Sequence, residues 1–296
     1  MTSSTDADMQ IIRERKPDLS PHSYNTYRQS LKRLYKVTPT LDIAAIKEYV
    51  YGLDNVAVAR NLLTPLLILR RPGARAIFDD LANRYEDYIT NQKPSERQRK
   101  NVTTLRDLKR MVRRMREDVL THKLLSRPKL NRRERRLLIA YISYSILLEL
   151  PMRSNLADLR VVQNENQTTT DDQHNYYVLS QRKIYLNRFK TQRAFARRNM
   201  LPLKLTLSRP VGKLVSDYYH THRHKHLFPD INKQTHNNIL LSQSYRYLGV
   251  RVGVTMLRHV VLSEFERTNP SLRERKEMML KMQQLHLETQ ISYAFR

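Results

Sequence analysis

Four side chains spread along the chain have the chemistry to break and rejoin a phosphodiester bond without a metal ion. Arg153 and Arg258 offer planar, forked donors that suit a phosphate group. Lys190 can give a proton to a leaving hydroxyl, and Tyr293 can hold the phosphate as an ester. Electrostatic stabilisation of the transition state would be the main contribution to the rate. These residue types together predict a transesterification centre.

Each of the four lies in a short stretch of distinct character. Arg153 follows a proline in "LPMRSNLADLR", and Arg258 lies on the amphipathic stretch "GVTMLRHVVLSEF". Lys190 lies in "YLNRFKTQRAF", a strand-and-turn region, and Tyr293 lies in the final "LHLETQISYAFR". Alone, each also has an ordinary structural interpretation, such as a capping arginine, a hairpin lysine or a tyrosine that docks a helix. Other basic residues compete with the lysine for its role: Lys183, Arg188 and Arg193.

The order and context of these stretches resemble the tyrosine recombinases, the lambda-integrase family of DNA breaking-rejoining enzymes. Within it they are most similar to the branch of large DNA viruses, virophages and related mobile elements. "SYNTYRQSLKRL" also resembles the first helix of a recombinase core-binding domain, so the likeness covers most of the chain. The resemblance implies that Arg153 and Arg258 clamp the scissile phosphate. It also implies that Lys190 protonates the leaving 5′-hydroxyl and that Tyr293 forms a 3′-phosphotyrosyl link.

Two positions depart from the family pattern. Thr255 stands three residues before the second arginine, where the family usually has His, and Gln284 stands nine before the tyrosine, where it usually has His or Trp. His259 matches a histidine often found after that arginine, and His286 lies two residues out of place. Thr and Gln can hydrogen-bond a phosphate oxygen, but neither is a general base near neutral pH. These four residues are further site candidates, and the route by which the tyrosine loses its proton stays open.

The patterns along the chain predict a mainly α fold with a small β insertion. Residues 1–17 are polar and predict a flexible N-terminus. Residues 18–91 have helical periodicity and predict a helical core-binding, DNA-binding domain, whose first helix begins at Ser20 with Pro21 in its first turn. Residues 92–102 are polar and charged and predict a linker.

Residues 103–296 predict a mixed α/β catalytic domain. Its first two helices begin at the capping pairs Thr104–Asp107 and Asn131–Glu134. "NYYVLSQRKIYLNRFKT" and "NMLPLKL" predict strands, and the chain then returns to helix. The last predicted helix comprises "SLRERKEMMLKMQQLHLETQISYAFR" and carries the tyrosine near its end.

The charge of the chain predicts a polyanionic partner. Lys and Arg number 54 against 28 Asp and Glu, which gives a formal net charge of +26. On charge alone the partner can be a nucleic acid, an anionic membrane or an acidic protein. The resemblance implies double-stranded DNA, which we expect to be bound in a strongly salt-dependent way. The helix after the linker has an apolar stripe and a cationic surface that we expect to follow the phosphate backbone: Arg106, Lys109, Arg110, Arg113, Arg114 and Arg116.

Several classes of protein are excluded or disfavoured. Cysteine is absent, which excludes disulfides and thiolate metal sites, and the 5 glycines form no phosphate-binding loop. No apolar run is long enough to span a membrane, and the N-terminus is no signal peptide. The run "HTHRHKH" leaves a metal site open as an alternative to a basic helix end, although alternate histidines fan around a helix. We therefore expect no metal, cofactor, membrane or small-molecule substrate.

The combined prediction is a site-specific recombinase or integrase that acts in DNA integration and recombination. The resemblance implies a homotetramer on paired DNA sites, inside a cell, in a host nucleus or a viral factory. Three alternatives remain: a DNA-binding relative with impaired chemistry, a type IB topoisomerase-like enzyme that relaxes supercoils, and a nucleic-acid-packaging protein.

Overall fold

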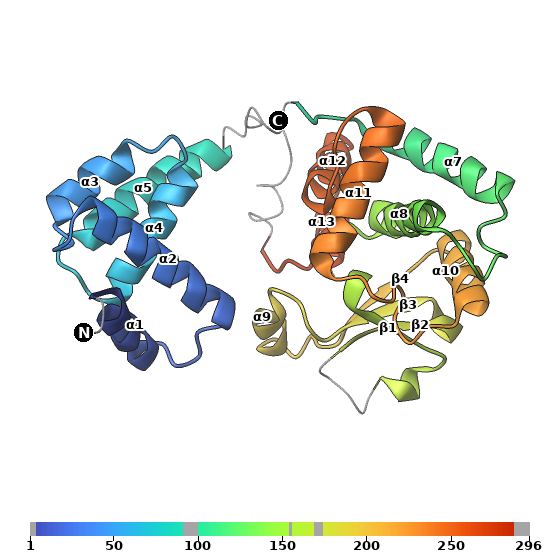
Figure 1. The fold of residues 1–296 in the computed structure, drawn as a ribbon, viewed down its shortest axis with the longest axis horizontal. Coiled ribbons are helices and arrows are strands. Elements are labelled where there is room, and N and C mark those ends of the chain that lie inside the picture. The colour runs from blue at the N-terminus through green and yellow to red at the C-terminus, as the bar shows by residue number, and fades with distance from the viewer. Residues whose placement is uncertain (1–3, 91–99, 154–155, 169–173, 287–296) are drawn as a thin grey trace. The chain divides into compact units, whose positions relative to one another are not determined.

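The computed structural model describes residues 4–90, 100–153, 156–168 and 174–286, with the backbone alone over 87–90. The chain divides into two compact units, Met1–Asn91 and Gln92–Arg296. In its described residues the first unit is helical throughout, and the second combines helices with a small sheet (Figure 1). The prediction of a mainly helical chain with a small β insertion is confirmed.

The first unit is a bundle of helices joined by short turns. α2 begins where the sequence predicts because the Ser20 side chain accepts a hydrogen bond from the Ser23 amide, with Pro21 in the first turn. The buried faces of the helices form one apolar core. The helices are α1 (Ser4–Arg15), α2 (Pro21–Val37), α3 (Ile43–Tyr51), α4 (Val56–Ile68) and α5 (Ala74–Thr90).

Helix α1 occupies most of the segment predicted to be a flexible N-terminus. Met9 and Ile12 are fully buried in the core of the first unit. Asp8 accepts a hydrogen bond from the Tyr35 hydroxyl at 2.7 Å. Burial, followed by the bond to Asp8, raises the pKa of Tyr35 to about 12. The prediction missed α1 because two apolar side chains three residues apart suffice to dock a helix, even when its composition is polar.

The second unit is built around α8, with other helices on several sides of it (Figure 1). α7 begins at Thr104, whose side chain accepts a bond from the Asp107 amide, and α8 begins with the predicted Asn131–Glu134 capping box. The helices are α7 (Leu105–Thr121), α8 (Arg132–Glu149), α9 (Gln192–Ala196), α10 (Arg209–His222), α11 (Lys233–Leu248), α12 (Val254–Arg267) and α13 (Leu272–Lys281).

The sheet has the strand order β1-β2-β3-β4. β1 pairs with β2 in parallel, and the other two pairs are antiparallel. The predicted β regions contain β2, β3 and β4, whereas β1 was not predicted. The strands are β1 (Leu159–Val162), β2 (Asn175–Val178), β3 (Lys183–Leu186) and β4 (Leu203–Thr206).

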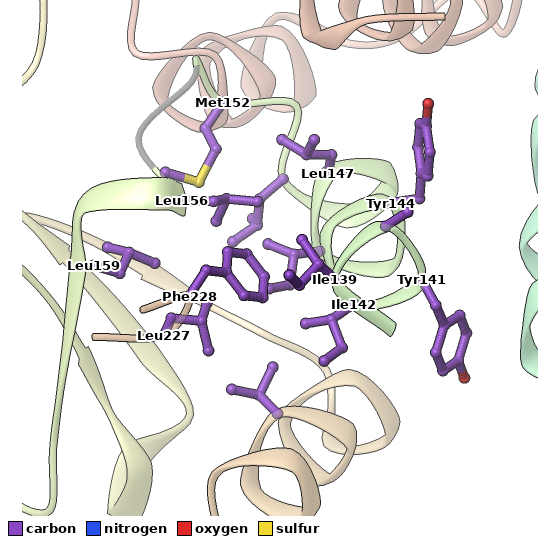
Figure 2. Close-up of a cluster of buried hydrophobic side chains, with 14 of the residues drawn as sticks. Ile139, Tyr141, Ile142, Tyr144, Leu147, Met152, Leu156, Leu159, Leu227 and Phe228 are labelled. Carbon is purple, nitrogen blue, oxygen red and sulfur yellow. The ribbon is translucent and has the colours of Figure 1, made fainter. Parts of the chain in front are cut away.

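The core of the second unit surrounds α8 instead of lying along one face of it. Figure 2 shows Ile139 and Ile142 of α8 lying against Phe228. Tyr141 and Tyr144 point to the opposite side of the same helix, and they too are buried. α8 is therefore a fixed central element, and the loop that follows it starts from a well-defined position.

The predicted final helix is shorter than the sequence indicates. α13 ends at Lys281, and Gln283 has a positive φ of 57°. The amide of Gln284 donates to the carbonyl of Met279 at 2.9 Å, and the amide of Gln283 donates to that of Leu280 at 2.9 Å. These bonds form a Schellman-type helix end without the usual glycine, so the prediction of one continuous helix is wrong at this point. Among the described residues, no helix has the length and apolarity to cross a membrane.

Candidate active site

Arg258 joins two segments that are distant in sequence. It lies in the second turn of α12 and is only 3% exposed. Its Nε donates to the carbonyl oxygen of Pro151 at 2.9 Å, and its Nη2 donates to the carbonyl oxygen of Met282 at 3.0 Å. The guanidinium therefore fixes the loop after α8 next to the chain that leaves α13.

Arg153 lies two residues after Pro151 and is half-buried. Its Nε is buried and has no hydrogen-bond partner among the described residues. A buried donor without a partner costs about 1–3 kcal/mol, so such groups need an explanation. A bound anion would satisfy this donor.

Lys190 is exposed in the turn that follows β3. The next residue, Thr191, donates from its hydroxyl to the carbonyl oxygen of Gln283 at 2.7 Å. This bond holds the Lys190 turn beside the segment that Arg258 also binds. Lys183 stands at the other end of β3, within the sheet, where it pairs with Val178 and Thr206. The geometry thus favours Lys190 over Lys183 as the basic residue of this region.

Gln284 directly follows the two residues whose carbonyls Arg258 and Thr191 bind. It is 2% exposed, and neither its Oε1 nor its Nε2 has a hydrogen-bond partner among the described residues. The positive φ of Gln283 costs about 1 kcal/mol for a residue that is not glycine. The positive φ belongs to the helix end described above, so the feature that needs an explanation is the buried Gln284 amide, which has no partner among the described residues.

Three hydrogen bonds therefore bring four segments of the chain together. They are the loop after α8, the turn after β3, the start of α12 and the chain after α13. In that order they contain Arg153, Lys190, Arg258 and Gln284. Tyr293 lies outside the described residues, so the catalytic roles of the set stay predictions. Thr191 was not predicted as a linking residue, and the one signal that could have found it is its position directly after Lys190.

The remaining site candidates lie at the edge of this region. Thr255 is exposed in the first turn of α12, one turn before Arg258. His259 is half-buried and has polar or ring contacts within the structure. His286 is exposed at the end of the described chain. Of the two positions that depart from the family pattern, only Gln284 is buried.

The cationic residues predicted on α7 are all exposed. Leu108, Met111, Met115 and Val119 form the buried stripe of the helix, which leaves its other faces to the basic side chains. Arg110 forms an ion pair with Asp107. A surface depression joins α7 to α12, and its lining residues are Leu105, Arg106, Lys109, Arg110, Arg113 and Glu264.

The histidine-rich run spans the end of α10. His220 and His222 lie in the last turn of the helix, and Arg223 ends it with a positive φ of 41°. His222 stacks on His224 with ring centroids 6.4 Å apart. Burial lowers the pKa of His222, which favours the neutral ring. Within the described part of the chain, no three metal-binding side chains of His, Asp or Glu gather at one point.

Comparison with known proteins gives one structural match to report. No protein-family model and no curated protein sequence match the chain. Among solved structures, the "Crystal structure of XerA recombinase" is similar over 98% of this chain and 93% of that chain. The identity is 13% and the TM-score is 0.43, so the match by itself assigns no function.

Proposed function

We propose that the chain is a tyrosine recombinase that breaks and rejoins duplex DNA. The observation that carries the proposal is the pair of hydrogen bonds that Arg258 donates to the carbonyl oxygens of Pro151 and Met282. These bonds support the proposal because Arg153 and Gln284 each follow one of the two bound carbonyls by two residues. The Thr191 bond adds the Lys190 turn to the same region.

In the proposed reaction the Tyr293 hydroxyl loses its proton to solvent water, and its oxygen attacks the scissile phosphorus. The bond from phosphorus to the 5′-oxygen breaks as the new ester forms, and Lys190 gives the leaving oxygen its proton. Arg153 and Arg258 hold the non-bridging oxygens, and Gln284 donates a further hydrogen bond from its amide. Religation is the reverse step, in which a 5′-hydroxyl attacks the phosphorus of the phosphotyrosine. The DNA phosphodiester forms again and the tyrosine is released.

The exposed cations of α7 support a DNA backbone as substrate. Guanidinium and ammonium groups that face solvent along one helix can follow successive phosphates, and binding then weakens steeply with added salt. We propose that paired sites are joined by a homotetramer, and that the reaction serves the integration or recombination of a viral or other mobile element. Those last assignments rest on the sequence resemblance.

A covalent-trapping assay tests the chemistry. A pool of nicked duplexes with a randomised centre is first enriched for binding to the protein and is then incubated with it in EDTA. A denaturing gel compares the wild type with Tyr293→Phe and with Tyr245→Phe, which alters an exposed tyrosine of α11. We expect a protein–DNA adduct in the wild type and in Tyr245→Phe, and none in Tyr293→Phe.

A second candidate is a DNA-binding relative that has lost the chemistry. Gln284 and Thr255 favour it, because neither can accept a proton from Tyr293 near neutral pH. On this reading the protein binds the enriched duplexes but gives no adduct with any variant. Relaxation of a supercoiled plasmid tests the topoisomerase alternative. A topoisomerase relaxes the plasmid as a monomer, whereas a recombinase joins paired sites.

A further inference from the structure

A second concentration of positive charge lies where the start of α8 meets the end of α11. The two helices run side by side, and Arg136 of α8 donates from Nη2 to the Ser242 hydroxyl of α11 at 2.9 Å. Between them is a pocket of about 430 Å³, within the size range of small-ligand sites. Its described lining residues include no Asp or Glu and are Arg132, Arg133, Arg136, Ser242, Gln243 and Arg246.

Two carboxylates of the elements around these arginines already have partners. Glu134 accepts a bond from Arg127 at 2.5 Å and closes the capping box of α8. Asp118 accepts a hydrogen bond from the Tyr247 hydroxyl. In the described part of the chain, none of the four arginines that line the pocket takes part in an ion pair. Among the described residues, no carboxylate therefore lies within ion-pair distance of these four guanidinium groups.

Two residues that line the pocket have buried polar atoms without a partner among the described residues. Gln243 is 6% exposed, and its Oε1 has no hydrogen-bond partner among the described residues. The Nε of Arg136 is buried and has none either. The Ser242 hydroxyl, which accepts the bond from Arg136, donates to the carbonyl of Ile239 at 2.9 Å and so fixes the position of that guanidinium. A ligand with acceptor oxygens would satisfy the Arg136 donor, whereas Gln243 Oε1 is itself an acceptor and would not bind such an oxygen.

We propose that this pocket binds phosphate groups, as a site separate from the candidate active site. Forked guanidinium donors match phosphate oxygens in geometry and charge. α8 has 18 residues, which corresponds to a length of about 27 Å, and the pocket and Pro151 lie at its opposite ends. The site does not depend on the proposed catalytic function. Its phosphates come either from a nucleic-acid backbone or from a free oligophosphate.

Binding of inorganic tripolyphosphate to the full chain, measured by calorimetry, tests the site. The pocket variant is Arg132→Ala/Arg133→Ala/Arg246→Ala, which alters exposed side chains and leaves Arg136 in place. The control variant is Lys213→Ala/Arg267→Ala/Arg273→Ala, which removes the same charge from exposed surface ion pairs of the same unit. Circular dichroism checks that both variants are folded.

We expect the pocket variant to lose at least about tenfold in tripolyphosphate affinity, since each charge-assisted bond contributes on that scale. The control variant stays within about twofold of the wild type. An equal loss in both variants, or no loss in the pocket variant, would overturn the proposal.

Duplex DNA binding at several KCl concentrations then identifies the source of the phosphates. If the source is a nucleic-acid backbone, the pocket variant has a log–log salt slope about 2–3 smaller than that of the control variant. If the two slopes agree while tripolyphosphate binding is lost, the site binds a free oligophosphate.

Discussion

The Nε of Arg258 lies 2.9 Å from the carbonyl oxygen of Pro151, although 107 residues separate the two in sequence. The same guanidinium binds the carbonyl oxygen of Met282. Arg153 and Gln284 each lie two residues beyond one of these carbonyls. One buried cation thus connects the two segments that carry these candidate phosphate ligands.

Replacement of Arg258 by Lys is expected to lower the free energy of unfolding by about 1–3 kcal/mol. A lysine keeps the charge but lacks the planar fork that reaches two carbonyl oxygens at once, so one acceptor loses its partner. Urea denaturation measures the change. Arg267→Lys, on the same helix and in an exposed ion pair with Glu264, should alter stability by less than about 0.5 kcal/mol. Equal stability of the two variants would contradict the structural role of Arg258.

Thr191→Val and Thr191→Ser form a matched pair for the bond to Gln283. Valine has the shape of threonine without the donor, whereas serine keeps the hydroxyl. We expect the valine variant to lose about 1 kcal/mol of stability and to form the covalent DNA adduct more slowly. The serine variant should retain most of both properties. Two variants with the same adduct rate would show that this bond does not position the Lys190 turn.

Gln284→Leu is expected to separate stability from activity. Leucine has a similar volume and removes the amide whose atoms lack partners among the described residues, so the free energy of unfolding should be unchanged or rise by about 1 kcal/mol. If the amide donates to the phosphate, adduct formation should fall by about tenfold or more. Thermal unfolding and the trapping assay measure the two effects. A large loss of stability would mean that the amide has a structural partner instead.

The buried His236 is expected to make the fold less stable in acid. Its ring is fully buried, with Nε2 2.8 Å from the Ser143 hydroxyl, and burial lowers its pKa to about 4. The unfolded chain, with a histidine pKa of about 6.5, binds the proton first as the pH falls. The contribution is fully present above pH 6.5 and declines between pH 6.5 and 4, by about 3 kcal/mol in total. In His236→Gln, urea unfolding at a series of pH values should lack this component. A parallel pH dependence of the two proteins would rule it out.

The parts of the fold that the sequence predicted are those set by local chemistry. Ser20, Thr104 and Asn131 each begin a helix because the capping group lies within three residues of its partner. The strand β1 depends instead on distant residues. It pairs with β2, and the amide of Val161 donates to the carbonyl of Lys225. The four residues of β1 do not by themselves indicate these distant partners.

The candidate site divides in the same way. Arg153, Lys190 and Arg258 were selected by residue type and order, which a sequence displays directly. Their proximity rests on Thr191 and on carbonyl groups, which a sequence does not display. The end of α13 was missed for a related reason, since Gln283 takes a conformation that usually signals itself through glycine.

Because Arg258 and Thr191 bind main-chain carbonyls, they recognise a path of the backbone and not the identity of any side chain. Every amino acid carries that carbonyl, so residues 151, 282 and 283 can drift during evolution while all three connections persist. Substitutions at these three positions would leave the hydrogen bonds intact wherever the new residue keeps the local dihedral angles. A homologue could therefore keep these three hydrogen bonds with little sequence similarity around them. Only Arg258 and Thr191 would show in its sequence that the bonds are present.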